Sequence, residues 1–311
     1  MHDHAHHFHY NRAFRWGVSL NVFYVLVEAG FGFQIGSLAL LSDAGHNLGD
    51  VLGLLLAWSG HALSQIPPSS KRTYGYQSAT ILAALFNALI LLMATGGIVW
   101  EAIGRFQEPS VPDSQTVIIV AGIGVVVNFV TTLLFVQKHD HDHDLNIRGA
   151  FLHMAADTGV SLGVVIGGIV IYYTGWTLVD PVLSLLIAAL ILWGTWGLLT
   201  ESVNMAMQAV PQSIDLHAVA AALRDDPGVT EVHDLHVWAM STTNIALTAH
   251  VIRPDSTGDA EYLREMSRVL REKFKIRHTT IQIDRQADAP DCQAHSACNM
   301  FGETPRNPTT D

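Results

Sequence analysis

Two His-x-x-x-Asp pairs, His46 with Asp50 and His153 with Asp157, interrupt long apolar stretches of the sequence. Residues four apart on a helix share one face and lie about 6 Å apart along its axis, so both members of a pair can reach one ion. Two imidazole nitrogens and two carboxylate oxygens make a four-ligand shell suited to tetrahedral Zn²⁺. The pairs therefore predict a divalent-metal site shared by two facing helices.

A simpler reading is that each histidine satisfies a hydrogen bond in a protein core while each aspartate pairs with a distant cation. The duplication of the pair argues against it, because no Lys or Arg lies within the core of any apolar stretch. A charged side chain at the centre of a bilayer costs about 2.5–3.5 kcal/mol on insertion scales, and such groups mark ion paths. A bound cation or protons must therefore neutralise these carboxylates.

Other polar residues lie near the first pair. Asp43 lies one turn before His46, where it could accept protons or orient His46, and packing or helix capping is an equal alternative. His61 follows Asp50 by eleven residues, at the cytoplasmic end of the stretch, as an entry ligand or a hydrated terminal histidine. Glu28 is a candidate for proton handling among polar residues that mainly hydrogen-bond between helices.

The elements that must position these residues are six apolar stretches. Each has roughly the 20 residues that a helix needs to cross a hydrocarbon core about 30 Å thick, and they lie near 16–36, 38–63, 79–104, 115–136, 147–172 and 181–199. Of the 17 Lys and Arg residues, only Arg105 falls outside the segments assigned to the cytoplasm. The sequence therefore predicts six transmembrane helices with both termini cytoplasmic, and the short loops suggest a bacterial inner membrane.

The composition favours a membrane protein that handles cations. Hydrophobic residues make up 49% of the 311 positions and charged residues only 14%. A formal net charge of −11 leaves no basic surface for nucleic acid, whereas 17 histidines suit a metal ion. Catalytic triads, phosphate loops and HExxH motifs are missing, so we expect no enzyme and no cofactor. We expect Zn²⁺ to be the ion that moves along the path, and also a structural or regulatory ligand.

From about residue 201 the sequence becomes polar and charged. We divide the chain into a His-rich cytoplasmic N-terminus, a six-helix membrane domain, a cytoplasmic metal-binding α+β domain and a flexible tail, at 1–15, 16–200, 201–286 and 287–311. Within the α+β domain the patterns predict helix, strand, strand, helix and strand, at 215–224, 230–239, 244–251, 260–273 and 279–284. This αββαβ order predicts a small sandwich with both helices on one face of the sheet.

The α+β domain carries a second candidate metal site. His233 and His250 lie on neighbouring predicted strands, and Asp284 ends the last strand, so three ligands can converge on one ion. His278, six residues before Asp284, is either a fourth ligand or an ordinary surface histidine.

Further metal-type ligands lie in polar segments. The runs HDHAHHFH (residues 2–9) and HDHDHD (139–144) predict weak, exchangeable metal capture near the mouth of the transport path. The tail residues Cys292, His295 and Cys298 could hold another ion. Their C-x₅-C spacing is looser than C-x-x-C, and an unstructured tail fits equally well. The two cysteines lie on the reducing side of the membrane, so no structural disulfide is expected.

Three motifs together resemble the zinc-transporting branch of the cation diffusion facilitator family. They are SLALLSDAGHNLGD (37–50), NIRGAFLHMAADTG (146–159) and VHDLHVW (232–238). The resemblance implies a homodimer that exports Zn²⁺ in exchange for protons, with a metallochaperone-like cytoplasmic domain. It also implies a transport site made by His46, Asp50, His153 and Asp157. A second, cytoplasmic Zn²⁺ site at the dimer interface would be made by His233, His250 and Asp284.

Rival functions stay open. A membrane metal sensor would bind the ion without translocating it, and only a flux assay separates the two. An intramembrane metalloenzyme would need an open coordination position, whereas four protein ligands close this one. Co²⁺, Cd²⁺ or Ni²⁺ could also be the main substrate, although a histidine at position 46 should disfavour Cd²⁺ relative to Zn²⁺.

Overall fold

The computed structural model describes residues 12–107, 112–136 and 145–285. The chain divides into two compact units. The first comprises Met1–Ala57 and Phe86–Leu199, and the second comprises Trp58–Leu85 and Thr200–Asp311. The second unit thus includes a segment that the sequence assigns to the membrane domain, and the sequence-based domain boundaries stay a prediction.

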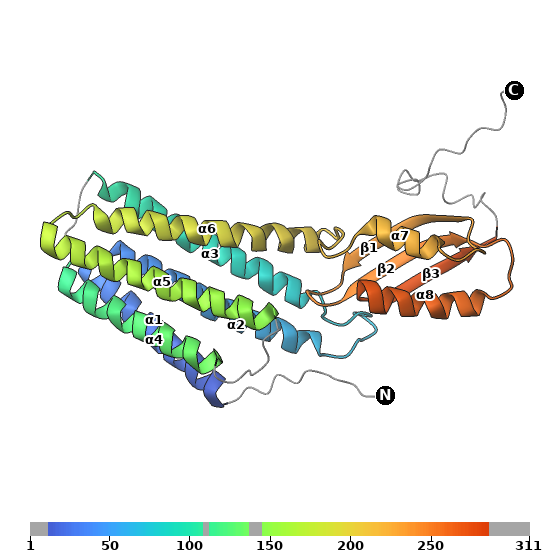
Figure 1. The fold of residues 1–311 in the computed structure, drawn as a ribbon, viewed down its shortest axis with the longest axis horizontal. Coiled ribbons are helices and arrows are strands. Elements are labelled where there is room, and N and C mark those ends of the chain that lie inside the picture. Colours follow the sequence, from blue (N-terminus) through green and yellow to red (C-terminus); the bar gives the residue numbers. More distant parts are fainter. Residues whose placement is uncertain (1–11, 108–111, 137–144, 286–311) are drawn as a thin grey trace, which may run out of the picture. The chain divides into compact units, whose positions relative to one another are not determined.

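Six long helices carry the apolar stretches in the described part of the chain (Figure 1): α1 (Arg12–Ile35), α2 (Leu38–Ser64), α3 (Ala79–Arg105), α4 (Ser114–Val136), α5 (Leu145–Thr174) and α6 (Val179–Ala206). Three segments among the described residues are long and apolar enough to cross a membrane: Ala79–Arg105, Ala156–Thr174 and Val179–Ala206. Ser19–Ile35 and Ser114–Val130 are apolar but shorter. The predicted helices are therefore present, whereas the number of six spans stays a prediction.

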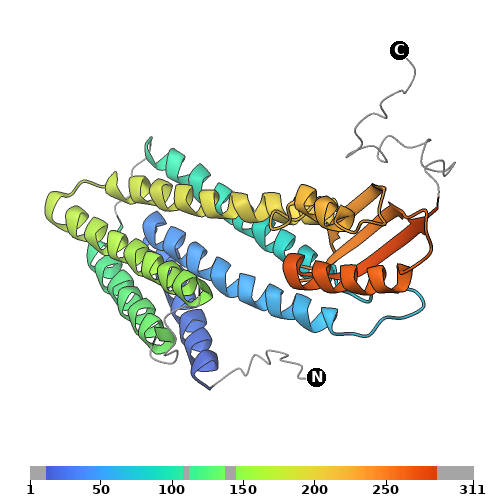
Figure 2. The same ribbon diagram turned by 45° about the vertical axis from the view of Figure 1, so that its right-hand side comes forward.

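Close helix packing organises the first unit. Helices α4 and α5 run side by side, and α1 packs against α4 (Figure 2). Small residues permit this approach, as in membrane helix pairs generally. A Cβ atom on Gly124 of α4 would lie 2.0 Å from the Tyr24 hydroxyl of α1, so only glycine leaves room for this tyrosine. The same glycine therefore fixes where the polar end of Tyr24 lies.

Asp180, near the start of α6, caps the beginning of α2. Its buried carboxylate accepts hydrogen bonds from the backbone N–H groups of Leu38 (2.8 Å) and Ala39 (3.2 Å) and from the Ser37 hydroxyl (2.6 Å). The Arg105 guanidinium lies 3.8 Å from the same carboxylate. The first N–H groups of a helix have no partner within the helix and attract an anion. This contact fixes where α2 begins, and with it the level of the polar residues along the helix.

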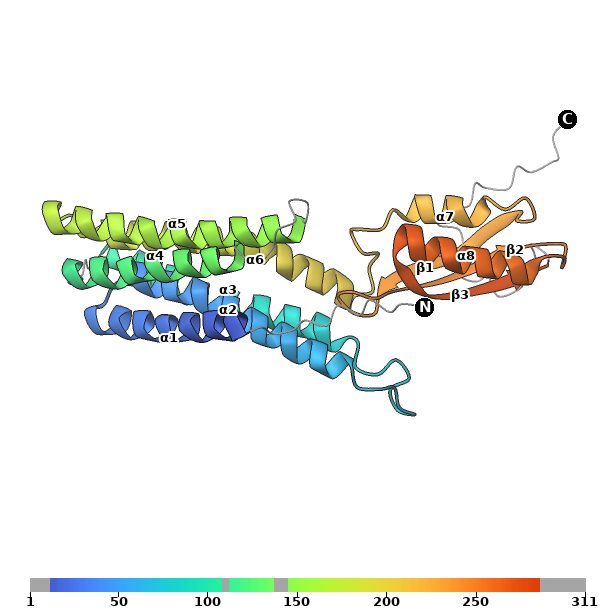
Figure 3. The ribbon, with the colours of Figure 1, turned by 60° about the horizontal axis from the view of Figure 1, so that its bottom comes forward.

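The second unit contains a three-stranded sheet in the order β1–β2–β3. Strand β1 (Glu231–Ala239) is antiparallel to β2 (Ile245–Ile252), which is parallel to β3 (Ile276–Asp284). Helices α7 (Leu216–Arg224) and α8 (Asp259–Phe274) lie beside each other over the sheet (Figure 3) and share one buried core with it. The αββαβ prediction is confirmed.

The last strand begins at Ile276, three residues before the sequence-based start at Thr279. Lys275 adopts a left-handed conformation with φ of 60° and ends α8, and its backbone N–H donates to the Leu270 carbonyl. Ile276 is fully buried. A helix that stops this sharply lets the chain enter the sheet at the very next residue.

Arg253 anchors the end of the sheet where Asp284 lies. Its buried guanidinium contacts the carboxylates of Asp226 (2.5 Å) and Asp259 (3.2 Å). Its backbone N–H donates to the Asp284 carbonyl at 2.8 Å. The Gly228 backbone N–H, together with Arg253, holds the pKa of Asp226 below its usual value. Asp226 therefore stays ionised at neutral pH, and the ion pair that anchors the strand end is present there.

We expect Asp180→Ala to lower the melting temperature of the detergent-solubilised protein. The substitution removes the acceptor for three donors at the start of α2 and the anionic partner of Arg105, and loss of a cap alone costs about 1–2 kcal/mol. Glu201→Ala is a suitable control, because it removes an exposed carboxylate from α6. Equal melting temperatures for the two variants would contradict the capping role.

Candidate metal sites

The first cluster of metal-type ligands joins α2 to α5. His46 and Asp50 of α2 and Asp157 of α5 each offer one ligand atom, and these atoms all lie within 4.8 Å of one another. The Nε2 atom of His46 lies 3.0 Å from Oδ1 of Asp157. Asp157 is buried, and the other two residues are half-buried. The structure thus brings together three of the four residues that the sequence assigns to the transport site.

His153, the fourth predicted ligand, lies four residues before Asp157 on the same helix. Residues at this spacing share a helix face. The side chain of His153 lies outside the described ones, so its participation stays a prediction.

Glycines on α2 allow α3 to pack closely beside the ligand-bearing helix. A Cβ atom on Gly49 would lie 2.1 Å from the Leu91 side chain, and one on Gly53 would lie 3.0 Å from Nδ2 of Asn87. Both glycines neighbour Asp50 in the helix, within three residues of it. Larger residues here would push α3 away and disturb the helix that carries the ligands.

Asp43 lies in a polar contact between α2 and α5. Its fully buried carboxylate accepts a hydrogen bond from the Ser161 hydroxyl at 2.7 Å and another from the Asn47 amide at 3.4 Å. The Asn128 amide of α4 donates in turn to the Ser161 hydroxyl at 3.4 Å. These bonds favour a role in linking helices over capping the start of α2.

His61 is exposed and belongs to the second unit, whereas His46 and Asp50 belong to the first. Its role on an entry path stays a prediction.

The second cluster lies on the face of the sheet opposite the helices. His233 and His250 are direct neighbours across β1 and β2, and their ring centroids are 5.3 Å apart. Oδ2 of Asp284 lies 3.2 Å from Nδ1 of His250 and 3.8 Å from Nε2 of His233. The core residues Leu247 and Val251 alternate with His250 along β2, which places the histidine on the face away from α7 and α8.

These three side chains have the chemistry of a zinc site. Both ring nitrogens of His233 and Oδ2 of Asp284 are buried and make no hydrogen bond. Buried polar atoms of this kind are nearly always satisfied in folded proteins. A divalent cation would satisfy them, and two imidazoles with one carboxylate are ligands that Zn²⁺ prefers.

A β-bulge in β1 shapes this cluster, and the sequence-based reasoning missed it. The pairing passes from His233 with His250 to His236 with Thr248, so β1 contains one extra residue. Asp234 occupies the bulge at a φ of 49°, and its carboxylate lies 3.7 Å from Nε2 of His250 and 2.9 Å from Nε2 of His236. Bulges and positive φ angles in non-glycine residues often re-aim side chains at functional sites. The only signal for this arrangement in the sequence is that Asp234 lies between two histidines in HDLH (233–236).

His278 does not join this cluster within the chain, which corrects its assignment as a fourth ligand. It pairs with Ala246, whereas Asp284 pairs with Ile252 at the other end of the strand. Six residues of β-strand span about 20 Å, too far for a shared ion. Its ring instead makes an edge contact with Tyr74, with centroids 5.4 Å apart.

The remaining candidate ligands, Cys292, His295 and Cys298, lie outside the described residues, as do the His-rich segments 2–9 and 139–144. Metal binding by them stays a prediction.

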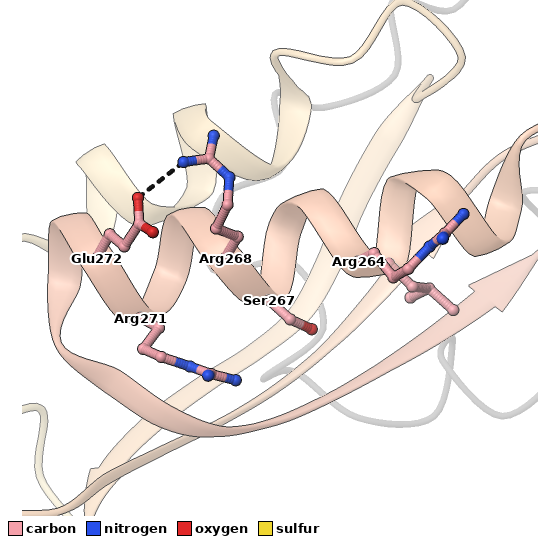
Figure 4. A pocket seen from close by; sticks show the side chains of 6 residues that line it. Arg264, Ser267, Arg268, Arg271 and Glu272 are labelled. Carbon is pink, nitrogen blue, oxygen red and sulfur yellow. Dashed lines mark hydrogen bonds and ion pairs between the residues drawn. The ribbon is translucent and has the colours of Figure 1, made fainter. Parts of the chain in front are cut away.

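A shallow pocket on the surface of α8 has a different character (Figure 4). Its lining is mainly cationic and consists of Leu263, Arg264, Ser267, Arg268, Arg271 and Glu272. Arg268 pairs with Glu265 at 2.6 Å and with Glu272 at 2.7 Å, and these contacts raise the pKa of Arg268. A surface of guanidinium groups repels metal ions, so this pocket does not compete with the two clusters.

Two family models match the chain. One is described as the cation efflux transmembrane domain and matches residues 15–207, and the other as the cation efflux protein, cytoplasmic domain, and matches residues 211–286.

Similar proteins include the cation efflux system protein CzcD of Alcaligenes sp. (strain CT14), which is 35% identical over 98% of this chain and 95% of its own. The zinc transporter ZitB of Escherichia coli (strain K12) is 38% identical over 86% of each chain. The cadmium, cobalt and zinc/H(+)-K(+) antiporter of Bacillus subtilis (strain 168) is 33% identical over 85% of this chain and 86% of its own.

One solved structure, the metal-bound C-terminal domain of the CzcD transporter from Cuprividus metallidurans, is 38% identical in sequence. The match covers 23% of this chain and 99% of that chain, with a TM-score of 0.21.

We expect His233→Ala and Asp284→Ala each to remove about one bound Zn²⁺ per chain, because each takes away one of three converging ligands. Mass spectrometry of the metal content after equilibrium dialysis of the full-length protein measures this loss. His278→Ala is the matched control, since it removes a histidine from the far end of β3. Zinc content unchanged in His233→Ala, or reduced equally in His278→Ala, would argue against the cluster.

Proposed function

This chain belongs to the cation efflux family, the cation diffusion facilitators, and we propose that it is a proton-coupled antiporter exporting Zn²⁺ from the cytoplasm. The observation that carries the proposal is the ligand cluster between α2 and α5. There His46, Asp50 and Asp157 offer three ligand atoms within 4.8 Å of one another. We add His153 as the fourth ligand.

The ligand types support Zn²⁺ as the main substrate. Zn²⁺ favours four-coordinate sites with nitrogen and oxygen ligands, and an imidazole at His46 weakens the case for harder ions that prefer oxygen alone. One similar protein is named a zinc transporter, and another is named for cadmium, cobalt and zinc. Co²⁺, Cd²⁺ and Ni²⁺ are therefore the competing substrates to measure.

Proton coupling follows from the chemistry of the same ligands. Metal ligands must be deprotonated before they bind, so protons and metal compete for one site. The 3.0 Å contact between Nε2 of His46 and Oδ1 of Asp157 is a hydrogen bond, which requires a proton between these two atoms. Zn²⁺ can bind both atoms only if that proton leaves their shared position.

Alternating access then turns competition into exchange. When the site faces the cytoplasm, neutral His46 and His153 and ionised Asp50 and Asp157 take up Zn²⁺. When it faces the other side, protons displace the metal from these ligands. The long apolar helices support a location in a membrane, and we place six spans with both termini cytoplasmic in a bacterial inner membrane.

We assign a regulatory role to the cytoplasmic cluster of His233, His250 and Asp284. Metal bound there would draw two subunits of a homodimer together and favour one transport conformation, which requires a different affinity in the two states. The family model for the cytoplasmic domain supports a homodimer. The His-rich segments would raise the local concentration of metal near the transport path.

We expect Zn²⁺ uptake into proteoliposomes with an acidic lumen to fall by about 10–100-fold in His46→Ala and in Asp157→Asn, because each variant loses one metal ligand. Stopped-flow records of a lumenal zinc indicator and a pH indicator measure both ions, and added Co²⁺, Cd²⁺ or Ni²⁺ tests selectivity.

His278→Ala is the control, because this histidine of β3 belongs to neither ligand cluster. Wild-type protein that binds Zn²⁺ without moving it would indicate a sensor. Zinc flux without counterflow of protons would refute the antiport.

A further inference from the structure

A second pair of acidic residues lies next to the α2–α5 ligand cluster without belonging to it. Glu28 of α1 and Asp43 of α2 are both fully buried, with 0% of their surface exposed. The two carboxyl groups interact directly with each other. The Tyr24 hydroxyl donates to Oε1 of Glu28 at 2.7 Å. The pair therefore sits inside the helix bundle, screened from water.

Among the described side chains of the first unit, no Lys or Arg neutralises this pair. In the first unit, side chains are described for residues 19–57, 86–107, 112–130 and 156–199, apart from positions 54 and 57, and Arg105 is the one Lys or Arg among them. Arg105 lies at the end of α3 and pairs with Asp180. Two buried carboxylates side by side would carry two uncompensated charges, which is prohibitively costly at low dielectric. The pair must therefore hold a proton.

The hydrogen bonds indicate which residue carries it. Asp43 accepts from the Ser161 hydroxyl and the Asn47 amide, and two such donors stabilise an anion. Glu28 accepts from the Tyr24 hydroxyl, and its second oxygen, Oε2, is buried without a hydrogen-bond partner. A proton makes that carboxyl group a donor towards Asp43, whereas ionisation would leave a bare charged oxygen. Glu28 is thus the protonated member.

The pair is mechanically tied to the metal ligands through both helices. Asp43 precedes His46 by three residues on α2, and Ser161 follows Asp157 by four residues on α5. The bond from Ser161 to Asp43 therefore joins α2 to α5 one turn away from the contact of His46 with Asp157. Any change in the separation of these helices alters the surroundings of both groups together.

We propose that Glu28 is a proton carrier of the transporter, separate from the residues that bind the metal. On the cytoplasmic side its carboxylic acid loses a proton to water, giving a carboxylate and a hydronium ion, as Zn²⁺ binds to the α2–α5 cluster. On the opposite side the carboxylate takes a proton from hydronium, leaving water, as Zn²⁺ departs. This inference rests on the proposed zinc–proton antiport. It adds one transported proton that the metal ligands do not account for.

The groups that face Glu28 are few. They are Tyr24 on its own helix and Asp43 and Asn47 on α2. The Tyr24 oxygen also lies 3.3 Å from the Val120 carbonyl oxygen of α4. Asp43 is the one other acid among them, so replacing Glu28 by a neutral isostere removes the exchangeable proton and keeps the shape of the site.

The test compares Glu28→Gln with wild type and with Tyr24→Phe in proteoliposomes. We expect Glu28→Gln to keep exchange of ⁶⁵Zn²⁺ for unlabelled Zn²⁺ at symmetric pH, because exchange needs no net proton movement. In Glu28→Gln, the acceleration of Zn²⁺ transport by an imposed pH gradient should fall by about tenfold or more. About one proton fewer should move per transported Zn²⁺ than in wild type. Tyr24→Phe keeps the acid and should keep the wild-type proton count, and Glu28→Asp should restore part of the gradient response.

An unchanged gradient response and proton count in Glu28→Gln would overturn the proposal. If that variant loses exchange as well, the deciding measurement is calorimetry of Zn²⁺ binding in detergent, repeated in buffers of different ionisation enthalpy. Release of one proton fewer per bound Zn²⁺ than in wild type supports the proposal, and equal proton release overturns it. Wild-type protein with no gradient response would instead refute the antiport itself, so the two failures are distinguishable.

Discussion

The scarcity of positive charge around buried carboxylates is the constraint on which the structure of the first unit depends. Its buried acidic side chains are stabilised in different ways. Asp180 is neutralised by helix N–H groups and Arg105, whereas Asp43 is stabilised by a hydroxyl and an amide. Asp157 lies against His46. The first solution is permanent, because neither a backbone N–H nor arginine gives up its proton, but the contact between His46 and Asp157 can change with pH or with a bound metal.

The two metal-type clusters differ in how firmly their surroundings hold them. His233 and His250 lie on paired strands whose other face is covered by a common core with α7 and α8, and Asp284 is fixed by the contacts at Arg253. Their spacing is set by a ladder of backbone hydrogen bonds. His46 and Asp157 lie on separate helices, so their distance depends on side-chain contacts between α2 and α5, among them the Ser161–Asp43 hydrogen bond. A site on strands suits a retained ion, and a site between helices suits one that must be released.

Sequence reasoning succeeds where the determining interactions are local. The helices, the αββαβ order and the placement of His46 and Asp50 on one face all follow from periodicities of a few residues. It fails where partners come from distant segments. Nothing near Asp180 indicates that it caps α2, and the bulge at Asp234 depends on the pairing register with β2.

Charge balance explains why metal and protons would exchange in this bundle. Zn²⁺ brings two positive charges into a space where the hydrogen bond between His46 and Asp157 holds a single proton. A neutral His46 that binds Zn²⁺ through Nε2 keeps its proton on Nδ1, so metal entry adds two positive charges, and a nearby acid that ionises can offset one of them. Glu28 is buried within the same bundle, interacts with Asp43, and has one oxygen without a hydrogen-bond partner. Under the proposed antiport, its ionisation would offset part of the added charge, and electroneutrality at low dielectric would link metal entry to proton loss.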